Sequence, residues 1–135
     1  DAPIRSALGE QCELDDDGRF YDHPDIVKTI AGLDLLVTER YHPAVFAVQA
    51  GTPVVPIAAT THKMTGLVDL VGHPIAVLDP PRADNLAPIL AAVERAYAEG
   101  PDLSARQRAF AAEANEQVND DYRDAFRQLW AKAPV

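Results

Sequence analysis

Blocks of apolar and polar positions alternate along the chain and predict strands and helices in turn. Continuous apolar runs over 33–37, 53–58 and 74–78 have the pattern of strands buried on both faces of a parallel sheet. The segments between them start at polar residues or prolines and end at glycine, which is typical of helices. The predicted helices begin after Asp1, after Asp22, at Tyr41 and at Lys63, and end at Gly9, Gly32, Gly51 and Gly72. Residues 12–14 have the pattern of a short strand.

Two further helices are predicted to close the chain. Apolar side chains share one face at helical spacing, and Gly100 follows them: Leu86, Ile89, Leu90, Val93 and Tyr97. Ser104 and Gln107 have the spacing of a capping box, which predicts a long last helix over about 104–132. Its apolar positions step by four residues, so the stripe drifts around the axis. We therefore expect this helix to bend or to pack beyond the domain.

Strands that alternate with helices predict an α/β fold, with a Rossmann-like parallel sheet, right-handed crossovers and flanking helices. A chain of 135 residues can bury its own core, so we assign 1–135 to a single Rossmann-like domain. No strand pattern precedes the first helix, although a doubly wound sheet would normally have one there. We therefore expect the chain to begin inside a larger protein.

Composition narrows the class of partner. The chain has 12 basic and 21 acidic residues and a formal net charge of −9, which argues against nucleic acid or an anionic membrane as the main partner. No apolar run is long enough for a transmembrane segment. The lone cysteine, Cys12, excludes an internal disulfide and fits a reducing, cytoplasmic compartment. Against this acidic background, a local group of cationic side chains is informative.

Polar clusters follow two successive predicted strands, and each cluster opens a helix. One covers 38–43 and the other covers 60–63. Ligands of open parallel sheets bind beyond the carboxyl ends of the strands, and helix N-termini attract anions. We therefore expect Arg40, His42 and Lys63 to face one space that holds a small anionic ligand.

The residue types in these clusters suit anion binding and proton transfer. Arg40 offers a planar fork for phosphate or carboxylate, and His42 can exchange a proton near neutral pH. Each also has an ordinary alternative: a salt-bridged surface arginine, a structural histidine or, for Lys63, a solvated helix start. His62 and His73 lack metal-ligand spacing with His42, so we predict no metal site.

An ordered set of residues resembles the polysaccharide pyruvyl transferase family. That family has Arg-x-His after a strand, a helix ending in Gly-x-Pro, a further strand, and a lysine about twenty residues past the histidine. The matching positions here are Arg40, His42, Gly51, Pro53 and Lys63. The close match covers roughly 24–79. Tyr41 stands where an aliphatic residue is common and Pro43 where a small one is usual, and either change would alter the pocket.

The resemblance implies the C-terminal half of a two-domain, glycosyltransferase-B-like enzyme of polysaccharide biosynthesis, with its site between the halves. It implies transfer of pyruvyl from phosphoenolpyruvate to a sugar or glycan acceptor, with formation of a pyruvate ketal and no further cofactor. His42, Arg40 and Lys63 would be catalytic. Substrate binding would involve Thr38, Arg40, Tyr41, Thr61 and Lys63. Without an N-terminal domain or another copy, we expect the fragment alone to be inactive.

Two other functions fit the same pattern. A sugar-nucleotide glycosyltransferase of this architecture would bind a diphosphate through Arg40 and Lys63 and a ribose through Asp79 or Asp84. A non-catalytic binding or assembly module would keep the fold without the chemistry. The acceptor sugar, the linkage and the oligomeric state stay open at this point.

Overall fold

The computed structural model of the chain describes residues 23–58, 62–82 and 84–131. In chain order the elements are α2 (His23–Ala31), β1 (Leu36–Thr38), α3 (Tyr41–Ala50), β2 (Val54–Pro56), α4 (Lys63–Val71), α5 (Leu86–Ala98) and α6 (Gly100–Ala131). The order of elements, with a parallel strand pair, is an α/β arrangement. The helix predicted over 1–9 and the strand predicted over 12–14 lie outside the described residues.

The sheet formed by the described residues has two parallel strands. Leu36 pairs with Val54 and Thr38 pairs with Pro56. Both strands are shorter than predicted. The first begins late because Leu33 belongs to the turn after α2, where its N–H donates to the Ile30 carbonyl at 3.1 Å. The parallel pairing of the two strands, with α3 between them in the chain, nevertheless agrees with the predicted parallel sheet.

The predicted strand over 74–78 is wrong. The structure has only an isolated parallel bridge there, between Ile57 and Leu78. Pro74 has no N–H to give to a strand ladder, and the N–H of Ile75 donates to the ring of His73 at 3.1 Å. This segment is therefore joined to the end of β2 by two backbone hydrogen bonds: the N–H of Leu78 donates to the carbonyl of Pro56, and the N–H of Ala58 donates to the carbonyl of Leu78.

Helices α3 and α4 have the predicted bounds. Each ends at a glycine with a left-handed backbone, Gly51 at φ 77° and Gly72 at φ 61°. Glycine adopts this conformation without the steric cost that a Cβ adds, which is why it ends helices so often. Helix α2 also agrees with the prediction, and Gly32 follows it as expected.

Helix α6 begins at Gly100, so the capping box predicted at Ser104 and Gln107 is wrong. Pro101 presets the helical φ in the first turn and Asp102 complements the positive end of the helix dipole, and together they start the helix earlier. Leu103 and Gln107, four residues apart, then turn inward. Gln107 is 1 % exposed, and its amide atoms have no hydrogen-bond partner among the described residues.

The core has two halves, one on each face of the sheet. Val54 and Val55 are consecutive in β2, so their side chains point to opposite faces. On one face the buried residues come from α2, α3, β2 and α4: Ile30, Ala44, Ala47, Val54 and Met64. On the other they come from β2, the segments after β2 and α4, and α5 and α6: Val55, Ile57, Ile75, Ala96 and Leu103. Helices therefore cover both faces.

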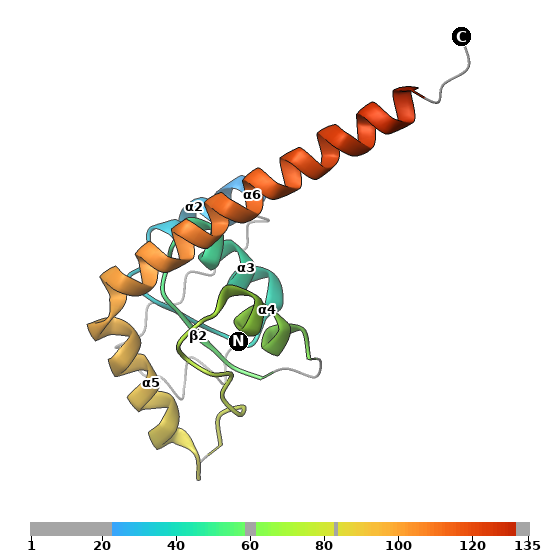
Figure 1. The fold of residues 1–135 in the computed structure, drawn as a ribbon. Helices are drawn as coiled ribbons and strands as arrows, with labels where there is room; N and C mark the ends of the chain where they lie inside the picture. Colours follow the sequence, from blue (N-terminus) through green and yellow to red (C-terminus); the bar gives the residue numbers. More distant parts are fainter. Residues whose placement is uncertain (1–22, 59–61, 83, 132–135) are drawn as a thin grey trace.

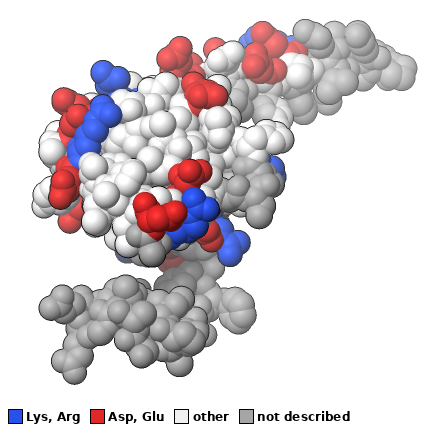
Figure 2. Space-filling model, turned by 90° about the horizontal axis from the view of Figure 1, so that it is seen from below, with Lys and Arg blue, Asp and Glu red and all other residues white. Residues whose placement is uncertain are grey.

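The second half of α6 runs clear of the rest of the described chain (Figure 1). From residue 115 onward, its described side chains are exposed. This helix is polar on average, and no helix in the described segments has the length and apolarity that crossing a bilayer requires. On the face seen in Figure 2, acidic and basic side chains are interleaved around a broad uncharged area.

Candidate functional site

The turn between β1 and α3 positions the first polar cluster. Thr38 Oγ1 accepts a hydrogen bond from the backbone N–H of Arg40 at 3.0 Å. Arg40 is extended (φ −91°, ψ 127°) and is the N-cap of α3. The chain therefore leaves the strand in a tight bend, and residues 39–43 are set around the first turn of the helix.

The second cluster is positioned by the start of α4. Lys63 is the first residue of this helix, and Met64 beside it is 2 % exposed and packs in the core. The N–H of Gly66 donates to the carbonyl of His62 at 3.0 Å, which closes the first helical turn. Burial of Met64 therefore anchors the point from which Lys63 projects.

An open pocket of about 470 Å³ lies where these two helices begin. Its lining comes from both polar clusters: Glu39, Arg40, Tyr41, His42, Pro43, Lys63 and Met64. The structure therefore brings Arg40, His42 and Lys63 to one space at the carboxyl edge of the two strands. Thr38 shapes the turn and is not part of the lining, and Thr61 lies outside the described residues.

The charges of the pocket are lightly paired. The Nε of Arg40 lies 3.8 Å from Oε1 of Glu39, and the Arg40 side chain is 81 % exposed. Such an exposed pair contributes little to stability, so the guanidinium is available to an anion. Lys63 has no carboxylate partner within the described segments. The rings of Tyr41 and His42 meet edge to face, with centroids 5.6 Å apart.

A comparison with known families bears on this pocket. The family model for polysaccharide pyruvyl transferase matches residues 11–60. This confirms the resemblance on Arg40, His42, Gly51 and Pro53, while Lys63 lies just beyond the match. No curated protein and no solved structure matches the chain significantly.

The match to a transferase family gives the pocket a chemical context. In a pyruvyl transferase the Arg-x-His residues lie after a strand, and here they lie on the wall of an open pocket with a lysine from the next helix. The catalytic and substrate-binding roles of these side chains stay predictions. Glu39 also lines the pocket; the sequence analysis included it in the polar cluster over 38–43 but gave it no role.

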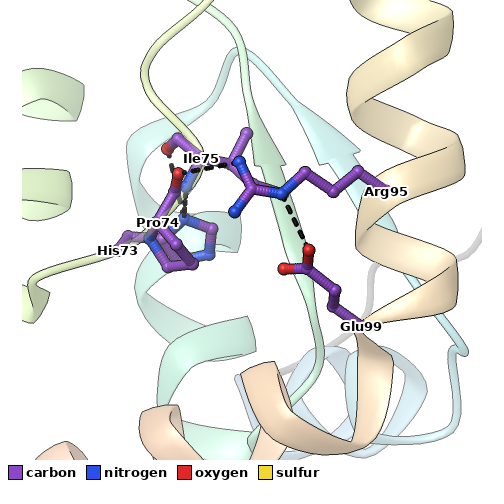
Figure 3. A network of polar contacts seen from close by, with 5 residues as sticks. All are labelled: His73, Pro74, Ile75, Arg95 and Glu99. Carbon is purple, nitrogen blue, oxygen red and sulfur yellow. Dashed lines mark hydrogen bonds and ion pairs between the residues drawn. The ribbon is translucent and has the colours of Figure 1, made fainter.

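His73 lies away from this pocket, in a network of polar contacts with a structural role (Figure 3). Its Nδ1 accepts the N–H of Ile75 at 3.1 Å, and Arg95 donates to the carbonyl of Pro74 at 3.3 Å and pairs with Glu99 at 3.0 Å. Burial lowers the pKa of His73, against an opposing effect of the Ile75 carbonyl and with a further lowering by the Arg95 charge. The neutral imidazole is therefore the form that fits the fold.

A second open pocket, of about 640 Å³, lies at the opposite ends of the strands. Asp34 and Pro53, which precede β1 and β2, line it together with Tyr97 and Arg108. In parallel sheets this is the edge that ligands seldom use. Within the described ranges, no three His, Cys, Asp or Glu side chains form a group that could hold a metal.

Proposed function

We propose that this chain carries part of the active site of a pyruvyl transferase that uses phosphoenolpyruvate as donor and a sugar hydroxyl pair as acceptor. The observation that carries the proposal is the single pocket that holds Arg40, His42 and Lys63. The match to the polysaccharide pyruvyl transferase family, which includes Arg40 and His42, supports it. The products are a pyruvate ketal on the glycan and phosphate.

The pocket suits a donor with two anionic groups. Arg40 binds the carboxylate or the phosphate of phosphoenolpyruvate through its planar fork, and Lys63 neutralises the phosphate as it leaves. No side chain caps the N-terminus of α3 at Arg40, so its first-turn N–H groups add to the positive field. Pro43 has no N–H, so the donors of this turn are the N–H groups of Tyr41 and His42; the proline breaks no intrahelical hydrogen bond, because an N–H this early in a helix has no intrahelical partner.

His42 is the proton donor in this proposal. Protonated, it gives its proton to C3 of phosphoenolpyruvate, and the π electrons of the double bond form the new C–H bond. C2 becomes electron-poor and is attacked by the sugar oxygen. Acid catalysis of this kind contributes roughly 100-fold to 10,000-fold in rate.

The pocket is open on its outer side. We propose that a second half closes it, either an N-terminal domain in a glycosyltransferase-B-like arrangement or another copy of the chain. The second half would supply further basic residues and hold the acceptor. This division fits a cleft site, in which each half contributes one wall.

The test uses the full-length natural protein with phosphoenolpyruvate and a panel of methyl glycosides. We expect phosphate release that depends on the acceptor, together with a new ketal methyl signal by NMR. His42→Gln should lower turnover roughly 100-fold or more while folding is kept. His62→Gln is the matched control, because His62 precedes α4 but does not line the pocket. Unchanged transfer by His42→Gln would remove His42 from this role.

The glycosyltransferase alternative predicts different binding. It requires a carboxylate for a ribose, but neither Asp79 nor Asp84 lines the pocket. Calorimetry of the full-length protein separates the two functions: phosphoenolpyruvate should bind and nucleoside-diphosphate sugars should not. The opposite preference would favour the glycosyltransferase, and binding of neither donor would favour a non-catalytic module.

A further inference from the structure

A carboxylate lines the cationic pocket, and the proposed donor gives it no partner. Glu39 lies on the pocket wall beside Arg40, and its side chain is 58 % exposed. A negative charge at this position opposes the binding of phosphate or carboxylate, since like charges repel across a few ångströms. A pocket for phosphoenolpyruvate alone would bind it better without Glu39. The second substrate, a neutral sugar, gives the carboxylate a different use.

The geometry of the turn keeps Glu39 at the pocket. It stands between Thr38, the last residue of β1, and Arg40, the N-cap of α3. The 3.0 Å hydrogen bond from the Arg40 N–H to Thr38 Oγ1 closes a bend around Glu39. The position of its backbone is therefore determined by the same strand and helix that position Arg40 and His42.

The carboxylate is also free to accept a hydrogen bond. Its Oε1 lies 3.8 Å from the Nε of Arg40, which is longer than a hydrogen bond. An ionised carboxylate is purely an acceptor, whereas arginine and a protonated lysine are purely donors. Among the side chains lining the pocket, Glu39 is thus a natural partner for a sugar hydroxyl while protonated His42 faces the donor.

We propose that Glu39 is a further catalytic residue, which binds the acceptor hydroxyl and takes its proton as the sugar oxygen attacks. The proposal rests on the proposed function and names the part of the same site that recognises the acceptor. The acceptor class is a vicinal or 1,3-related pair of sugar hydroxyls, because a ketal needs two oxygens within reach of one carbon.

The proton balance closes with two groups. His42 protonates C3, the first hydroxyl oxygen bonds to C2, and its proton passes to Glu39. The C2–O bond to phosphate then breaks, and phosphate leaves with the electron pair and takes the proton from Glu39. The second hydroxyl oxygen bonds to C2 and its proton returns to His42. Both residues end in their starting forms, and the products are the ketal and hydrogenphosphate.

Glu39→Gln in the full-length protein tests this role, because it keeps the shape and removes the charge. We expect turnover with phosphoenolpyruvate and the methyl glycoside panel to fall roughly 100-fold or more. By calorimetry, phosphoenolpyruvate alone should bind at least as tightly as to wild type. The acid limb in the pH profile of kcat/KM for the acceptor should be lost, and Glu39→Asp should restore part of the rate.

Asp34→Asn is the matched control. Asp34 is an exposed carboxylate that precedes β1, whereas Glu39 follows it, and Asp34 lines the pocket at the opposite edge. The turnover of Asp34→Asn should therefore equal that of wild type. Wild-type turnover in Glu39→Gln would overturn the proposal. So would a loss explained by weaker phosphoenolpyruvate binding, since Glu39 would then only position Arg40. If the wild-type protein forms no ketal with any acceptor, the proposed function itself fails, and the Glu39 proposal fails with it.

Discussion

His73 shows how one side chain can link the fold to pH. Its ring is largely buried, Nδ1 contacts the backbone of Ile75, and Nε2 has no hydrogen-bond partner in the part of the chain that the structure describes. Protonation would place a charge in this apolar setting, near the positive charge of Arg95. Burial, the main cause, therefore lowers the pKa of His73 below its ordinary value of 6.5.

Stability should fall as the pH falls through about 6.5. Below the ordinary pKa the unfolded chain takes up a proton at His73 that the folded chain does not, so protons favour unfolding. Above that value the contribution of the neutral ring is fully present. Urea unfolding between pH 8 and pH 5 measures this effect. The free energy of unfolding of His73→Gln should decrease less steeply toward low pH than that of wild type, and that of the control His62→Gln should decrease as in wild type. Equal slopes of this free energy against pH in all three proteins would contradict the role given to His73.

Single residues also show how much of the candidate site could be predicted from the sequence. Arg40, His42 and Lys63 were predictable because the carboxyl ends of parallel strands share an edge, and the structure places all three on one pocket. Glu39 was not, because one more glutamate in an acidic chain has the pattern of ordinary surface. Gln107 was predicted to be part of a capping box because of its spacing from Ser104, whereas in the structure it is buried within α6.

At the scale of elements, local chemistry decided which predictions were right. The bounds of α3 and α4 follow from glycines that no other residue replaces cheaply, Gly51 and Gly72. The strand over 74–78 had the right composition but not the right partners, because His73 competes for the N–H of Ile75. Pairing depends on donors meeting acceptors, and an apolar run does not contain that information.

Gly51 should be the least replaceable of three helix-associated glycines. Its φ is 77°, and a Cβ there would run into the side chain of Arg108. Gly51→Ala should therefore destabilise by about 2 kcal/mol, the left-handed backbone and the displaced arginine adding together. Urea unfolding of the purified variant provides the measurement.

Two matched variants separate the causes of that loss. Gly72→Ala has the same backbone strain, at φ 61°, with open space around the new Cβ, so it should cost about 1 kcal/mol. Gly66→Ala lies inside α4 with nothing near its Cβ and should stabilise by roughly 0.5–1 kcal/mol. If Gly51→Ala cost no more than Gly72→Ala, the contact with Arg108 would have no energetic weight.

At the scale of the whole molecule, the described residues form a packed body with a protruding helix. Leu103 and Gln107 tie the first turns of α6 to the core, whereas Val118 and Tyr122 are 50 % and 74 % exposed. A helix without packing is marginal in water. The sequence indicated this in part, since the apolar stripe of α6 drifts around its axis. The Rossmann-like, single-domain organisation stays a prediction.

Amide hydrogen exchange should divide α6 in two. Amides from Leu103 to about Ala114 should exchange slowly, because they open only with the body of the fold. Amides from about Glu116 to Arg127 should exchange much faster in the isolated chain, because they open by local fraying. Uniform protection along the helix would contradict this division and would show that the second half is covered in solution.

Met64 joins the pocket to the core, since it lines the open pocket and also belongs to the buried cluster under α3. The chain contains one methionine in all. A preparation carrying a carbon-13 label on the methionine methyl group would therefore yield a single resonance, free of assignment work. That resonance originates from the floor of the candidate site, so its displacement during titration would report occupancy directly.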